Sequence, residues 1–310
     1  MKKVTLVSGE PGAGHAIELS LGLREYVDLT TVWRVRSAYK FDYLEPHALY
    51  GYGNIPPEGD EIIIVSTAGF NLLRKYYRNH PGGLDGFLSG YNEVKIVITD
   101  DSPMFDPQGY IALFKNYQVW ATICKIHFRG DEPTKPYYRP FDLSNIDRTK
   151  NEKLTVAHSP FCAKKRPEKG TAEIEEIVKG RNVDFDIISG LTWADAIQRK
   201  AKAHIFVDQI DHFRKGEFKY FNPDYTWIAF GKSSDEAMHL GCLTITWGRD
   251  QDIGHPIPPV AWCTKENFEG VLDYYISEKS AREELANKQY EWQMQYGTRD
   301  YAAKNLLNLL

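Results

Sequence analysis

The segment GEPGAGHA, residues 9–16, follows an apolar run and has the glycine spacing of a loop that binds phosphate. A P-loop continues with a lysine and a serine or threonine, which contact the phosphates and Mg²⁺. This chain has His15 and Ala16 at those positions, so phosphoryl transfer would be poorly served. Gly14 and His15 therefore predict one of two structures: a loop whose backbone approaches a ligand beside an imidazole, or a plain β–α turn with His15 in solvent.

A cationic loop precedes a predicted helix within TVAHSPFCAKKRPEKGTAEIEEIVKG, residues 155–180. Arg166 and Lys169 lie in this loop, and Gly170 leads into the helix, which we expect Thr171 to cap. A helix N-terminus next to cationic side chains favours the binding of a diphosphate. The alternative is a solvated basic loop without a ligand.

A second glycine loop enters a short predicted helix within AFGKSSDEAMHLGCLTI, residues 229–245. Ser233 and Glu236 have the spacing of a capping box, in which the glutamate holds the start of the helix. The functional alternative is that Glu236 accepts hydrogen bonds from two sugar hydroxyls, as carboxylates do in nucleotide sites.

Two acids follow a buried strand in ITDDSP, residues 98–103. Asp100 or Asp101 could activate or orient an acceptor hydroxyl, because the carboxyl ends of parallel strands face a ligand crevice. Alternatively, one of them forms a turn before Ser102 and Pro103. No group of His, Cys, Asp and Glu has the spacing of a metal site.

Apolar β-rich runs alternate with amphipathic helical patterns along the chain, which predicts an α/β protein with right-handed crossovers. The expected strands are residues 3–8, 61–66, 94–99, 118–123, 154–158, 183–188, 204–207, 243–246 and 260–263. The expected helices are residues 17–25, 172–179, 193–202, 235–240 and 266–277, with a helical end from residue 280 that breaks at Gly297. We expect two Rossmann-like, doubly wound domains that face each other across a cleft.

The proline-rich, charged stretch at residues 131–153 is typical of an interdomain connection. We expect an N-terminal domain over residues 1–150 and a C-terminal domain over residues 151–287. A final helix, residues 288–310, is expected to pack back on the first domain.

The composition is that of a globular protein: 310 residues, 42% hydrophobic and 26% charged, with a net charge of −4. This charge argues against a protein that coats nucleic acid non-specifically, although a local basic groove remains compatible with it. Four widely spaced cysteines indicate a reducing compartment, and no run reaches the ~20 apolar residues that span a bilayer. We expect a cytoplasmic protein without a membrane partner, in the host cytoplasm if a phage encodes it.

The order and spacing of motifs in residues 154–248 resemble the C-terminal domain of retaining glycosyltransferases of the GT-B fold, the glycogen- and sucrose-synthase-like group. The residues that carry this resemblance are Arg166, Lys169 and Gly170, then Asp208 and Gln209 in KAKAHIFVDQI, and then Phe230, Gly231, Glu236 and Ala237. One departure is Ile228, which stands where the family has the first of two glutamates, near the transferred sugar.

The resemblance implies transfer of a sugar from a nucleotide sugar, such as a UDP-sugar, to an acceptor hydroxyl, with retention and without a metal or other cofactor. The resemblance assigns the donor contacts to three groups of residues: Arg166, Lys169, Gly170 and Gly14 on the diphosphate; Glu236, Asp208 and Gln209 on the nucleoside; and Phe230, Gly231, Lys232 and Ser233 on the sugar. His15, Asp100 and Asp101 would be the catalytic candidates on the acceptor side. The alternative from another class is a non-catalytic protein that binds a nucleotide or nucleotide sugar, which Ile228 favours.

The acceptor is left open by the sequence. Small enzymes of this group include phage enzymes that glycosylate hydroxymethylated bases in DNA. The basic, aromatic stretch CKIHFRGDEPTKPYYRP, residues 124–140, could hold double-stranded DNA while a flipped base enters the site. Protein, glycan and small-molecule acceptors are the alternatives.

Overall fold

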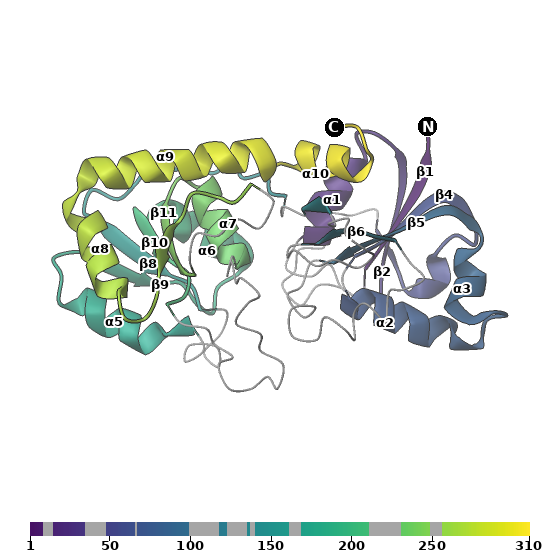
Figure 1. Ribbon diagram of the computed structural model, residues 1–310, viewed down its shortest axis with the longest axis horizontal. Helices are drawn as coiled ribbons and strands as arrows, with labels where there is room; N and C mark the ends of the chain where they lie inside the picture. The colour runs from purple at the N-terminus through teal and green to yellow at the C-terminus, as the bar shows by residue number, and fades with distance from the viewer. Residues whose placement is uncertain are drawn as a thin grey trace. The chain divides into compact units, whose positions relative to one another are not determined.

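The computed structural model describes residues 1–8, 15–34, 48–65, 67–98, 118–122, 135–136, 140–160, 169–210, 231–248 and 256–310 (Figure 1). They form two compact units, Met1–Pro140 with Thr298–Leu310, and Phe141–Gly297. Each unit has its own parallel sheet and its own hydrophobic core.

The first unit is built on a seven-stranded parallel sheet in the order β3-β2-β1-β4-β5-β6-β7. Its strands are β1 (Lys3–Ser8), β2 (Asp28–Trp33), β3 (Leu49–Tyr50), β4 (Gly59–Val65), β5 (Tyr91–Ile98), β6 (Gln118–Thr122) and β7 (Lys135–Pro136). The central strands β1 and β4 are almost continuously buried, as expected for parallel strands covered on both faces.

The α-helices among the described residues of this unit are α1 (His15–Leu23), α2 (Thr67–Tyr76), α3 (Gly83–Leu88) and α10 (Arg299–Leu306). The C-terminal α10 packs closely on α1, because Gly22 has no side chain: a Cβ there would lie 2.5 Å from the carbonyl oxygen of Arg299. An ion pair between Arg299 and Glu18 also joins the two helices. At the far end of α10, the ammonium of Lys95 donates to the carbonyl oxygen of Leu306 at 3.0 Å.

The second unit has a five-stranded parallel sheet in the order β12-β11-β10-β8-β9. Its strands are β8 (Thr155–His158), β9 (Asp184–Ile187), β10 (Ile205–Val207), β11 (Leu243–Trp247) and β12 (Ala261–Cys263). Its helices are α5 (Thr171–Lys179), α6 (Trp193–Ala201), α7 (Lys232–His239), α8 (Phe268–Ser277) and α9 (Lys279–Tyr296).

Helices cover both faces of this sheet. Because alternate residues of a strand point to opposite faces, neighbouring residues of β8 belong to different cores. Val156 of β8 joins a core with residues of α5, α8 and α9. Its neighbour Ala157 joins a second core with residues of α6 and α7. Phe141 and Leu143 are buried in that second core, so the part of the predicted interdomain connection that begins at residue 141 belongs to the second unit.

The nine predicted strands each overlap an observed strand, and the five predicted helices and the helical C-terminal end are also confirmed. The elements absent from the prediction are β2, β3, β7, α2 and α3. Two of these strands have only two residues, and α3 has six residues including two glycines, so their sequences carry little periodic signal. In the described part of the chain, no helix is both long and apolar enough to cross a membrane.

Candidate functional site

The strand order of the second unit reverses at β8. The chain passes from β8 through α5 to β9 on one side, and then through α6 to β10 on the other side of β8. Connections that leave β8 and β10 therefore diverge at the carboxyl ends of these strands, which is where doubly wound sheets bind ligands. Lys169, Gly170, Asp208 and Gln209 all lie at this edge.

The start of α5 is fixed by His158, the last residue of β8, which is fully buried. Its Nδ1 lies 2.8 Å from the carbonyl oxygen of Val207, and its Nε2 lies 2.9 Å from the hydroxyl of Thr171. Because a carbonyl only accepts, Nδ1 must carry a proton, and in the neutral ring Nε2 accepts from Thr171. The predicted capping role of Thr171 is wrong: it is the first residue of α5, and Gly170 occupies the N-cap position.

Gly170 has a left-handed backbone, with φ of 72°, which strains any residue with a side chain. A Cβ there would also lie 2.7 Å from Cγ1 of Ile210. Gly170 has no side chain with which to cap α5, and in the first turn the carboxylate of Glu173 accepts from its own backbone N–H and pairs with Lys265. Lys169 lies beside this positive helix end, an arrangement that suits an anion.

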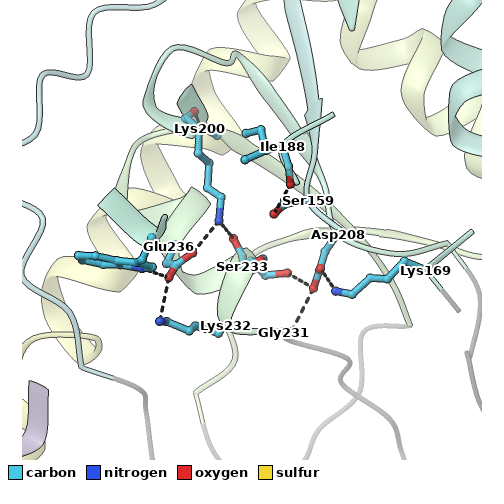
Figure 2. Close-up of polar contacts among 12 residues, drawn as sticks. Ser159, Lys169, Ile188, Lys200, Asp208, Gly231, Lys232, Ser233 and Glu236 are labelled. Atoms are coloured by element: carbon cyan, nitrogen blue, oxygen red, sulfur yellow. Dashed lines mark hydrogen bonds and ion pairs between the residues drawn. The ribbon is translucent and has the colours of Figure 1, made fainter. Parts of the chain in front are cut away.

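The carboxylate of Asp208, directly after β10, is fully buried and accepts three polar contacts. One oxygen pairs with the ammonium of Lys169. The other accepts from the hydroxyl of Ser234 at 2.7 Å and from the backbone N–H of Gly231 at 3.1 Å (Figure 2). Burial raises the pKa of Asp208, but Lys169 and Ser234 outweigh it and hold the pKa below its usual value.

Glu236 is the second buried carboxylate near the start of α7. Its Oε2 lies 2.6 Å from the ammonium of Lys200, and its Oε1 accepts from the indole N–H of Trp193 at 2.7 Å. The ammonium of Lys232 lies 3.3 Å from Oε1, at 5.4 Å from the centre of the Trp193 ring (Figure 2). Burial raises the pKa of Glu236, but Lys200 and Lys232 outweigh it and hold the pKa at about 2.

The predicted capping box of Ser233 and Glu236 is wrong. The helix begins two residues earlier, with Gly231 as N-cap, and the carboxylate of Asp208, not that of Glu236, accepts from the backbone N–H of Gly231. Glu236 binds Lys200, Trp193 and Lys232 instead. The main-chain carbonyl of Ser233 lies 3.4 Å from the ammonium of Lys200, so Ser233 belongs to the same cluster through its backbone.

The sequence did not single out Lys200 and Trp193, although a signal was present. On α6, Ile197, Lys200 and Ala201 have the spacing of one helix face, and all three are buried. A lysine on an apolar face requires an acidic partner, and Glu236 supplies it.

Most of the other predicted site residues lie outside the part of the chain that the structure describes. Gly14, Asp100, Asp101, Arg166 and Phe230 lie outside the described residues, as does Ile228. His15 is the first residue of α1. Of the stretch at residues 124–140, only Lys135–Pro136, in β7, and Pro140 are described. No group of metal-ligating side chains is present among the described residues.

No protein-family model matches the chain, and no curated protein matches it in sequence. Solved structures do match it in fold. An alpha-glucosyltransferase in complex with UDP and a 13-mer DNA containing an HMU base matches with a TM-score of 0.61 and 11% identity, over 100% of this chain and 99% of that one. Anabaena Alr3699/HepE in complex with UDP and glucose matches with a TM-score of 0.63 and 10% identity, over 100% and 99% of the two chains.

UDP-GlcNAc 2-epimerase from Neisseria meningitidis bound to UDP-GlcNAc also matches, with a TM-score of 0.59 and 10% identity over 99% of each chain. Glycosyltransferases and an epimerase therefore share this architecture, and likeness at such identity shows the fold alone. The two parallel sheets with flanking helices are the Rossmann-like domains of the GT-B fold.

Proposed function

We propose that the protein is a glycosyltransferase that moves a sugar from a nucleotide sugar to an acceptor hydroxyl. The observation that carries the proposal is the convergence of Lys169, the N-terminus of α5 and the ionised Glu236 at the strand reversal of the second unit. An anion site and a hydrogen-bond acceptor at one edge of the sheet match the diphosphate and the ribose of a nucleoside diphosphate.

The donor contacts follow the charges of the site. Lys169 and Arg166 bind the diphosphate, with Gly170 and Gly14 close to it. Negative charge grows on this diphosphate as it leaves, so fixed cations lower the barrier. The remaining donor contacts are Glu236 on the ribose, Gln209 near the base, and Phe230, Gly231, Lys232 and Ser233 on the transferred sugar.

Glu236 suits a ribose diol because its low pKa keeps it an acceptor at neutral pH. Lys200, Trp193 and Lys232 contact the carboxylate of Glu236. Lys200 is the fixed partner, since its side chain is only 2% exposed. Lys232, at 16% exposed, is the partner that a ribose hydroxyl displaces, and its cation is then released toward the donor.

The transfer breaks the bond between the anomeric carbon and the diphosphate oxygen, and forms a bond from that carbon to the acceptor oxygen. Asp100 or Asp101, or His15, takes the proton of the acceptor hydroxyl. We propose retention at the anomeric carbon and no requirement for a metal or another cofactor, both on the resemblance of the motifs.

For the acceptor, we propose a hydroxymethylated base in DNA. The support is the fold likeness to the alpha-glucosyltransferase in complex with UDP and an HMU-containing DNA, together with the basic stretch at residues 124–140. The sugar is proposed to be a hexose carried by UDP, as in the neighbour in complex with UDP and glucose.

A second candidate is a non-catalytic protein that binds a nucleotide or nucleotide sugar, which Ile228 favours because the first glutamate of the family motif is missing. Incubation with UDP-glucose, with and without duplex DNA containing 5-hydroxymethylated bases, separates the candidates when products are identified by mass spectrometry. Glycosylated DNA supports the proposal, whereas binding without turnover supports the non-catalytic candidate. Conversion of UDP-GlcNAc to its 2-epimer would replace both with an epimerase.

A further inference from the structure

Asp208 joins three separate segments of the second unit. It follows β10 directly, its carboxylate pairs with Lys169 at the start of α5, and it accepts from Gly231 and Ser234 at the start of α7. The side chain is fully buried, and these contacts use both of its oxygens. A base or sugar therefore has no free carboxylate oxygen to reach in this arrangement.

Gly231 is required here for space and not for its backbone conformation. Its φ is −73°, which any residue adopts. A Cβ at this position would lie 2.6 Å from Oδ2 of Asp208, closer than a non-bonded contact allows. The motif glycine thus lets the carboxylate approach the backbone N–H of residue 231.

The charge of Asp208 suits both of its neighbours. A carboxylate at the positive end of α7 is favoured by the helix dipole, and the ammonium of Lys169 neutralises it. The side chain of Lys169 remains 16% exposed. Its ammonium carries three N–H donors, of which the pairing with Asp208 directs one.

We propose that Asp208 is a positioning residue for a nucleoside diphosphate: it fixes Lys169 against the start of α7, and Lys169, not Asp208, contacts the phosphates. The inference rests on the proposed function, because the ligand is the donor diphosphate. It gives Asp208 a different role from the contact with the donor base that the motifs predict. The site then recognises the phosphates through Lys169 and the start of α5, which the contacts of Asp208 hold to the start of α7.

The test measures the affinities of UDP and of uridine for wild type, Lys169→Gln, Asp208→Asn and the double variant, by calorimetry and ligand-observed NMR. We expect each single substitution to weaken the affinity for UDP about tenfold, which corresponds to the loss of a hydrogen bond to a charged group. Uridine affinity should not change, because uridine has no phosphate. The double variant should bind UDP no more weakly than Lys169→Gln, because both substitutions remove the same contact.

Gly231→Ala displaces the Asp208 carboxylate without changing its charge. It should also weaken the affinity for UDP and leave the affinity for uridine unchanged. It decides the matter if Asp208→Asn does not fold. Gly270→Ala on α8 is the matched control, since a Cβ there meets no atom within 4 Å, and UDP affinity should be unchanged.

Three results would overturn the inference: equal losses for UDP and uridine, additive losses in the double variant, or no loss of UDP affinity in Asp208→Asn and Gly231→Ala. In each of these cases a wild type that binds UDP leaves the proposed function standing. A wild type that binds neither UDP nor uridine overturns both.

Discussion

A deeply buried lysine–glutamate pair is present among the described residues of each unit, and the two pairs have different surroundings. In the first unit, the ammonium of Lys95 lies 3.0 Å from Glu61, with side chains 2% and 0% exposed. In the second unit, Lys200 lies 2.6 Å from Glu236, with side chains 2% and 6% exposed. The residue types and the burial are nearly the same, so neither feature alone identifies a functional site.

The difference lies in the place of each pair along its strands. Glu61 is in the first half of β4 and Lys95 is in the middle of β5, and their further contacts are protein groups, namely Lys2, Glu93 and the carbonyl of Leu306. This pair ties the C-terminal helix α10 to the sheet.

Glu236 lies instead on the helix that follows the carboxyl end of β10. Its other partners, Lys232 and Trp193, are only partly buried. A ligand that enters at the carboxyl ends of parallel strands can therefore compete for Glu236 but not for Glu61. The two pairs thus differ in their place along the strands and not in their charges or burial.

The largest expected effect is on stability in the first unit. Glu61→Ala leaves the buried Lys95 with the partly exposed Glu93, at 3.3 Å, as the carboxylate of its remaining ion pair, and should lower the free energy of unfolding by about 3 kcal/mol. Urea denaturation measures this loss, and UDP affinity of the folded variant should not change. Glu93→Ala is the control, with a smaller loss because its side chain is 36% exposed; equal losses would contradict a structural role centred on Glu61.

Glu236→Gln should reduce donor turnover about 100-fold, because the neutral amide is a weaker acceptor for the ribose hydroxyls than a carboxylate. Steady-state release of UDP from UDP-glucose measures the effect, with thermal melting to establish that the variant is folded. Glu61→Gln is the matched control in the other pair and should keep wild-type turnover. Similar losses in both variants would show that the two pairs do not differ in function.

A third effect is the dependence of stability on pH. The folded pKa of Glu236, at about 2, lies below its ordinary value of 4.5, so its contribution is fully present above pH 4.5 and is lost as the pH falls toward 2. Wild type should lose on the order of 2 kcal/mol more than Glu236→Gln between pH 5 and about 2.5. Parallel urea titrations across this range test it, and identical pH dependence of the two proteins would contradict the low pKa.

The smallest effect concerns the indole of Trp193. Trp193→Phe removes the 2.7 Å hydrogen bond to Glu236 but keeps an aromatic ring beside Lys232. It should cost about 1 kcal/mol of stability and raise the KM for the donor only a few-fold. A loss of turnover as large as that of Glu236→Gln would instead assign the indole a direct role in the reaction.

Most of the fold was readable from the sequence because the central strands are long apolar runs between amphipathic helices. EIIIV in β4 is buried as such a run predicts. The missed strand β2, DLTTVW, has polar residues in its first half, and its place in the sheet depends on pairing with β1. Tertiary pairing of this kind has no signal within the segment itself.

The site was predicted less completely than the fold. The family resemblance assigned Lys169, Asp208 and Gly231 to one donor site, and the side chains of Lys169 and Asp208 and the backbone of Gly231 do contact one another. Local capping rules misassigned Thr171 and Glu236, because tertiary partners, His158 and Lys200, took the groups that a cap would use. Such competition between local and distant partners is decided only by the folded structure.

Thermal melting of wild type, Glu236→Gln and Glu61→Gln, each with and without UDP-glucose, tests the account most directly. A ligand that binds the folded state raises the melting temperature by mass action. We predict a rise for wild type and for Glu61→Gln, and none for Glu236→Gln. A rise of equal size in all three proteins, or in none, would contradict the claim that the carboxyl edge of the second sheet binds a nucleotide sugar through Glu236.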